Sequence, residues 1–175
     1  MEGMKRYYGK WFVFDIETTG FHADTSLLLA IGLKNKEEEK IFFVERPSFE
    51  KIVLKQFLRF LEARQVECLI GYNILSFDIP YLRAKFLLNN LNVWSLEKLE
   101  FIDLFEFMKK LRLGSLKLAY ISKLLFNSPN SSSFQMPTFY LKYMEDEQFK
   151  KKIIEHLKND LKNTMLLAFR LGIIS

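Results

Sequence analysis

Four carboxylates occur in this chain in an order that suits the binding of two divalent metal ions. Asp15 and Glu17 lie in FVFDIETTG, Asp78 in GYNILSFDIPYL and Asp160 in EHLKNDLKNT. Two ions about 3.5–4 Å apart need several such oxygen ligands on a rigid scaffold. A DxE pair or an isolated Asp is common by itself, whereas the ordered set of four is not. The leading hypothesis is therefore hydrolysis of phosphodiester bonds by a two-metal mechanism.

The spacing of the first pair indicates how it is presented. Asp15 and Glu17 are two residues apart at the end of an apolar segment, so on a strand both side chains leave one face while Ile16 points to the other. If this strand end were simply exposed, the two would be ordinary acids. The apolar residues before them favour a ligand pair, because α/β proteins bind ligands at the carboxyl edge of the sheet.

The other two acids lie next to predicted helices. Asp78 precedes a helix with Pro80 in its first turn, so it can be a metal ligand or an N-cap. His156 and Asp160 are four residues apart on the last helix and share a face. A lone His on a helix is more often an ordinary surface or core residue without a catalytic role. An imidazole beside a metal-bound carboxylate, however, is well suited to act as a general base. We interpret His156 as a catalytic residue of this kind.

Strand-like and helix-like segments alternate along the chain. Strands are predicted over 11–16, 27–33, 41–44, 68–72 and 99–102. Helices are predicted over 48–63, from Pro80 to about 90, and over 104–113, 116–126 and 146–171, with Ser48, Gly114 and Ser115 as capping residues. Short turns between the first three strands predict an antiparallel meander within a mixed α/β sheet.

Two further segments complete the predicted layout. Asp103, at the end of the fifth strand, is either a fifth acid of the site or the cap of the next helix, and we predict the cap. The Ser-rich stretch 127–138 is predicted to be a mobile surface loop. No internal repeat or linker is present, so residues 1–175 are predicted to form a single domain.

Composition limits the class of protein. The 175 residues are 49% hydrophobic and the mean hydropathy is −0.01, which is typical of a globular chain. A formal net charge of +5 suits a polyanionic partner, although a lysine-rich solvated surface would give the same number. Cys68 is the only cysteine, which excludes an internal disulfide and a thiolate zinc cluster. Without a secretory signal or a long apolar segment, a cytoplasmic protein without membrane contact is expected.

The motifs FDIET and GYNILSFDIPYL, followed by an aspartate on a late helix, resemble those of the DEDD superfamily of 3′–5′ exonucleases. The resemblance is greatest to the branch that contains the proofreading domains of family B DNA polymerases and stand-alone archaeal and bacterial relatives. It covers residues 11 to about 170. It implies a ribonuclease H-like fold, a five-stranded mixed sheet flanked by helices. It also implies two Mg²⁺ or Mn²⁺ ions, held by Asp15, Glu17, Asp78 and Asp160.

One position departs from the family pattern. The tyrosine branch has Tyr four residues before the last Asp, and the histidine branch has His five residues before it. Here His156 occupies the four-before position and Glu155 the five-before position. An imidazole is a better base near neutral pH than a phenol, so the exchange is compatible with activity.

The resemblance implies a 3′–5′ exonuclease acting on nucleic acid, in particular on the 3′ ends of single-stranded DNA, in replication or repair. Three alternatives remain. The first is a structure-specific or RNA-processing nuclease with the same acids, and the second is an inactive nucleic-acid-binding module. The third is a subunit that associates with a polymerase or forms a homo-oligomer. Thr18 and Thr19 either meet the terminal nucleotide or simply form a turn. Aromatic and basic side chains near the motifs would hold a single strand: Phe21, Tyr72, Phe77, Tyr81, Phe105, Lys109, Lys110, Arg112 and Lys150–Lys152.

Overall fold

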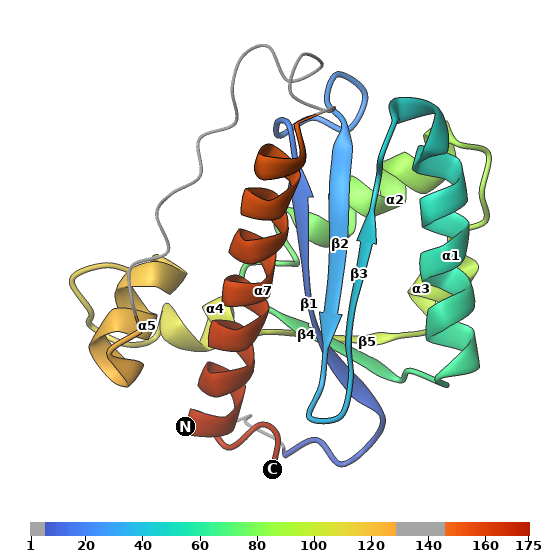
Figure 1. The fold of residues 1–175 in the computed structure, drawn as a ribbon. Helices are drawn as coiled ribbons and strands as arrows, with labels where there is room; N and C mark the ends of the chain where they lie inside the picture. Colours follow the sequence, from blue (N-terminus) through green and yellow to red (C-terminus); the bar gives the residue numbers. More distant parts are fainter. Residues whose placement is uncertain (1–5, 129–145) are drawn as a thin grey trace.

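A five-stranded mixed sheet forms the centre of the molecule (Figure 1). The computed structural model describes residues 6–128 and 146–175. The strand order is β3-β2-β1-β4-β5; β1, β2 and β3 are antiparallel, and β4 and β5 run parallel to β1. The predicted α/β fold class and the predicted meander are therefore confirmed. The bounds are β1 Trp11–Thr18, β2 Leu28–Lys34, β3 Glu39–Phe43, β4 Cys68–Gly71 and β5 Glu100–Asp103.

Helices cover both faces of the sheet because the central strand is apolar on both sides. Phe12, Phe14 and Ile16 of β1 pack with α1 and α2, whereas Val13 packs with α4, α5 and α7. Figure 1 shows α7 running along β1 and β2. The helices are α1 Glu50–Ala63, α2 Asp78–Leu88, α3 Trp94–Glu97, α4 Leu104–Met108, α5 Leu118–Phe126 and α7 Glu147–Arg170, with a 3-10 turn η1 at Pro47–Phe49.

Three predicted helix ends are wrong. Ser48 does not cap α1, since it lies inside η1 and α1 begins at Glu50 without a side-chain cap. The helix predicted over 104–113 stops at Met108, because the amides of Lys110 and Leu111 bond to the carbonyls three residues back instead of four.

The next helix starts at Leu118 rather than at residue 116. The Tyr72 hydroxyl donates to the Leu116 carbonyl, and the following Lys117 is extended. Gly114 is therefore not a left-handed helix end, and Ser115 accepts only a 3.3 Å bond from the Lys117 amide. Local capping rules missed this tertiary contact.

The predicted terminal helix is confirmed as α7. Asp146 caps it through the amide of Gln148 at 2.8 Å, and Cys68 is fully buried in the core. Most of the predicted Ser-rich loop, residues 129–138, lies outside the described residues. Among the described residues, no helix has the length and apolar character needed to cross a membrane.

Candidate metal centre

The predicted ligand pair lies at the carboxyl end of the central strand. Asp15 and Glu17 leave β1 on the face covered by α7, while Ile16 between them enters the core under α1 and α2. In the register with β2, Asp15 lies opposite Gly32 and Glu17 opposite Ala30. Two very small neighbours thus border the acids, which lets another element approach them closely.

That element is α7, whose apolar stripe seats it on the sheet. Leu157 and Leu161 are completely buried and pack on Gly32, where a Cβ atom would lie 2.9 Å from Leu157 Cγ and 2.7 Å from Leu161 Cδ1. This close approach brings the other predicted residues of α7, His156 and Asp160, beside β1. Side chains 139 residues apart in the sequence thereby meet, with His156 Nδ1 2.8 Å from Glu17 Oε1.

Asp78 is hydrogen-bonded to the same strand from α2. It is buried in the first turn of α2, and its Oδ1 accepts a 3.1 Å hydrogen bond from the backbone N–H of Ile16, between the two acids of β1. Phe77, at the N-cap position of α2, makes no side-chain cap bond. Asp78 is therefore the first residue of α2 rather than its N-cap, and its carboxylate is bonded to β1.

Asp103 caps α4 as predicted, and it has a second role that the sequence did not reveal. Its Oδ1 accepts from Phe105 N at 3.0 Å and from Asn73 N at 2.7 Å, and its Oδ2 accepts from Leu75 N at 3.0 Å. The carboxylate thus organises the loop that leads to Asp78. The parallel pairing of β4 with β5 places Asp103 opposite Gly71, where the loop begins. In the loop, Asn73 has a left-handed φ of 64°.

Burial and mutual repulsion shift the pKa values of three of the four acids. The pKa of Asp15 lies well above its usual value because the group is buried, and Asp78, Glu17 and Asp160 add repulsion. Burial also raises the pKa of Asp78 to about 7 and that of Asp160 to about 6, with repulsion from Glu17 in both cases. Burial and like charge both disfavour ionised carboxylates, and a bound cation would oppose both effects.

His156 joins this group as a partner of two acids. Its Nδ1 contacts Glu17 Oε1 at 2.8 Å and lies 3.6 Å from Asp160 Oδ2. The hydrogen bond to Glu17 is the main reason why the pKa of His156 is raised, against the effect of burial. Since a carboxylate only accepts, the proton of this bond is on Nδ1.

The donor set fits a divalent cation in kind. All four acids offer the hard oxygen ligands that Mg²⁺ and Mn²⁺ prefer. Asp160 Oδ1 is buried and accepts no hydrogen bond from the residues described, which leaves a lone pair suited to a cation. Within residues 6–128 and 146–175, however, no three acidic, His or Cys side chains converge as a ready-made chelate. Cation binding would therefore require rotation of these side chains, Glu17 included.

A turn of residues 19–27, the β1–β2 turn, follows the acids of β1. Thr18 Oγ1 donates to the Gly20 carbonyl at 2.8 Å, and Thr19 Oγ1 accepts from Leu27 N at 2.8 Å, so both hydroxyls form the turn. A groove of about 420 Å³, here called the turn–α2 groove, lies between this turn and α2. Its lining includes Phe21, His22, Phe77, Tyr81 and Leu87.

The other predicted substrate contacts have mixed surroundings. Tyr72 and Phe105 pack edge to face at 5.5 Å. Lys109 pairs with Glu106, and Lys150 pairs with Glu45, so these two lysines are partly neutralised. The remaining cations of the two basic clusters are exposed on their helices or turns: Lys110, Arg112, Lys151 and Lys152.

Comparison with known proteins assigns this chain to a superfamily. A model of the RNase_H superfamily matches residues 12–171, and the chain therefore belongs to that superfamily. It is 30% identical over 161 residues to an uncharacterised protein of Methanocaldococcus jannaschii, covering 87% of this chain and 89% of that one. The predicted ribonuclease H-like fold, a fold of nucleases, is thus confirmed.

A solved structure with the same fold supports the predicted resemblance. The family B DNA polymerase of the archaeon Pyrobaculum calidifontis superimposes with a TM-score of 0.74 at 18% identity. The match covers 92% of this chain and 24% of the polymerase. This chain therefore corresponds to about a quarter of the polymerase, and the likeness establishes a shared ribonuclease H-like fold.

Proposed function

We propose that this protein is a metal-dependent 3′–5′ exonuclease that hydrolyses single-stranded DNA, acting in the cytoplasm in DNA repair or replication. One observation carries the proposal. β1, α2 and α7 bring Asp15, Glu17, Asp78 and Asp160 to one edge of the sheet, where burial, with added repulsion between acids, raises the pKa of Asp15, Asp78 and Asp160. Membership of the RNase_H superfamily supports it, as does the fold shared with part of a family B DNA polymerase.

The four acids are the proposed ligands of two Mg²⁺ or Mn²⁺ ions. The ions would supply a water of lowered pKa and stabilise the leaving 3′ oxygen. Asp78 is held by the Ile16 amide through Oδ1, so Oδ2 is the atom that can turn to a cation. Glu17 keeps Oε2 for the same purpose while Oε1 contacts His156.

His156 is the proposed general base. Its Nδ1 donates to Glu17 Oε1 at 2.8 Å, and in the neutral ring this makes Nε2 the nitrogen that accepts a proton. The carboxylate therefore orients the imidazole and stabilises its charged form, which is why the pKa of His156 is raised. A Tyr at this position has one hydroxyl group, so it could not bond to Glu17 through one ring atom and accept a proton on another.

Side chains near the centre suit a single strand. Unpaired bases bind aromatic faces, and phosphates bind cationic side chains. The Phe21 ring is 84% exposed beside Phe77 and Tyr81, directly after the acids of β1. A base of an unpaired 3′ end can enter the turn–α2 groove there, with Lys151 and Lys152 exposed on α7.

The first experiment is digestion of a 5′-labelled single-stranded oligodeoxynucleotide with Mg²⁺ or Mn²⁺. Wild type is compared with Asp15→Ala and with Glu37→Ala, an exposed acid of the β2–β3 hairpin. We expect a ladder that shortens from the 3′ end, lost with EDTA and in Asp15→Ala but retained in Glu37→Ala.

Other results would select the alternatives. Internal cuts would indicate a structure-specific endonuclease, and cleavage of a matching RNA alone would indicate an RNA-processing enzyme. Binding of the oligonucleotide without any cleavage would contradict the proposed activity and favour a nucleic-acid-binding module.

A further inference from the structure

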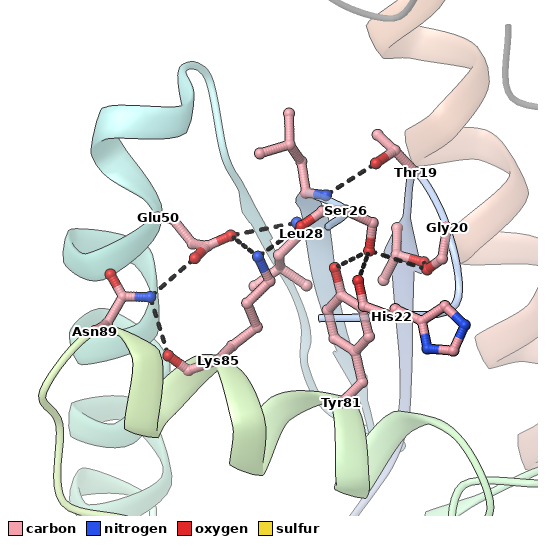
Figure 2. A network of polar contacts seen from close by, with 11 residues as sticks. Thr19, Gly20, His22, Ser26, Leu28, Glu50, Tyr81, Lys85 and Asn89 are labelled. Carbon is pink, nitrogen blue, oxygen red and sulfur yellow. Dashed lines mark hydrogen bonds and ion pairs between the residues drawn. The ribbon is translucent and has the colours of Figure 1, made fainter. Parts of the chain in front are cut away.

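A buried ion pair lies beneath the β1–β2 turn (Figure 2). Lys85 Nζ of α2 is 2.9 Å from Glu50 Oε2 of α1, and the side chains are only 6% and 11% exposed. Lys and Glu are rarely buried unless paired, and a buried pair is often no more stabilising than apolar residues of the same volume. Stability alone therefore gives no reason for charges here.

The ion pair holds the turn through its backbone and through one serine. Lys85 also donates to the Ser26 carbonyl at 2.7 Å, and Glu50 Oε2 accepts from Leu28 N at 3.3 Å. The Ser26 hydroxyl lies 2.9 Å from the Tyr81 hydroxyl and donates to the His22 carbonyl at 2.6 Å (Figure 2).

These bonds tie the turn to the helix that carries Asp78. Tyr81 and Lys85 are one helical turn apart on α2, and Asp78 is in the first turn of the same helix. On the other side, the turn continues directly from Glu17. The network therefore sets the position of the turn relative to two elements of the candidate metal centre.

The turn presents Phe21 to the turn–α2 groove. The Phe21 ring is 84% exposed. It contacts the Phe77 ring edge to face, with 5.9 Å between the ring centroids. Because so little of the side chain is packed, its position depends mainly on the conformation of its backbone. That backbone is held by Ser26, through Gly20 at 3.2 Å and through His22.

We infer that Ser26, Tyr81 and Lys85 are positioning residues that hold the β1–β2 turn so that the turn–α2 groove receives the terminal nucleotide of the substrate. The inference rests on the proposed function. Since these residues act through the turn, their loss should weaken substrate binding and leave the metal centre intact.

The test compares Ser26→Ala and Tyr81→Phe with Asn89→Ala. Asn89 donates to Glu50 Oε1 and to the Lys85 carbonyl, so its loss removes bonds of the network but none of those that reach the turn. Lys85→Met is made together with Glu50→Gln, because removal of the lysine alone would leave a buried charge. A double variant of Ser26 and Tyr81 tests whether the two act as one unit.

Two readouts separate positioning from folding. The first is KM and kcat for release of nucleotides from the single-stranded oligodeoxynucleotide with Mg²⁺. The second is the Kd of the same oligonucleotide by fluorescence anisotropy in EDTA. We expect Ser26→Ala and Tyr81→Phe to raise KM and Kd by up to about tenfold, as lost hydrogen bonds would, with kcat nearly unchanged. Asn89→Ala should lower Tm while leaving KM and Kd unchanged.

Each contrary result has a distinct meaning. Unchanged KM and Kd in Ser26→Ala, with only Tm lowered, would overturn the positioning role, as would a loss confined to kcat or to metal dependence. An inactive wild type would contradict the proposed function, and Kd would then decide the positioning role by itself: a weakened Kd would support it and an unchanged Kd would overturn it.

Discussion

Two regions of the described structure hold buried charges whose surroundings differ. Beneath the β1–β2 turn, Glu50 is matched by the ammonium of Lys85, by Asn89 and by the Leu28 amide. At the edge of β1, the buried carboxylate of Asp15 is repelled by those of Asp78, Glu17 and Asp160, and the described partner of Glu17 and Asp160 is the imidazole of His156.

The difference shows which region is complete in itself. A fully satisfied polar network rigidifies the structure that it joins, whereas groups with perturbed pKa values gather where function needs them. The Lys85–Glu50 network balances its charge within the chain. The acids of β1, α2 and α7 carry an excess of negative charge that a cation from outside would neutralise.

The largest expected effect is on catalysis at the uncompensated region. Asp78→Asn keeps an oxygen for the Ile16 amide but removes a proposed metal ligand. We expect the rate of cleavage to fall on the order of 10³-fold, because metal ions supply several kcal/mol of charge stabilisation. In EDTA the same variant should melt at a higher temperature than wild type, since one repelling charge is gone.

The matched control is Glu155→Gln, an exposed acid of α7 next to His156. It should retain wild-type cleavage and melting. Cleavage by Asp78→Asn within tenfold of wild type would contradict a ligand role for Asp78.

The compensated region should respond to mutation in the opposite way. Lys85→Met leaves Glu50 buried without its cation, and we expect the free energy of unfolding to fall by about 3–5 kcal/mol. Adding Glu50→Gln should recover a large part of that loss. Urea denaturation measures both effects, and Lys51→Met, an exposed lysine of α1, should change the free energy by less than about 0.5 kcal/mol. Equal free energies of unfolding for Lys85→Met and Lys51→Met would show that the Lys85–Glu50 pair does not compensate a buried charge.

The packing of α7 on the sheet predicts a smaller effect. In Gly32→Ala the new methyl group would lie 2.7 Å from Leu161 Cδ1, so α7 must shift. Overpacking of this kind costs about 1–3 kcal/mol, and displacement of Asp160 should also lower the cleavage rate. The control is Gly114→Ala, whose nearest neighbour would be Tyr120 Oη at 3.4 Å. If thermal melting and cleavage are the same in both variants, α7 is not held by this contact.

The smallest expected effect is the pH dependence of the metal-free protein. The pKa of Asp78 rises to about 7 from an ordinary value of 3.8, and those of Asp160 and His156 are also raised. A raised pKa in the folded state adds stability below the unfolded value, and this stability is lost as the pH passes the folded value. In EDTA, Tm should therefore fall by a few degrees from pH 5 to pH 8.

Two comparisons check the cause of this fall. Mn²⁺ or Mg²⁺ should reverse it, because a cation neutralises the acids, and Asp78→Asn should make it shallower. A Tm in EDTA that is constant over this range would show that the acids are not destabilising when ionised.

The candidate site was predictable from sequence to the extent that it depends on local spacing. Asp15 and Glu17 share a face because strands repeat every two residues, and His156 and Asp160 share one because helices repeat about every four. The sequence could not show that Asp103 organises the loop before Asp78. An aspartate at the end of a strand is equally compatible with a cap, and Asp103 is both.

The sequence by itself determined the class of fold, because apolar periodicity acts over a few neighbouring positions, and its motifs marked the four candidate acids. Only the tertiary structure decided that His156 pairs with Glu17, that Lys85 is buried against Glu50, and that α4 ends at Met108. These features depend on contacts between segments far apart in the chain, which form only when helices and sheet have packed.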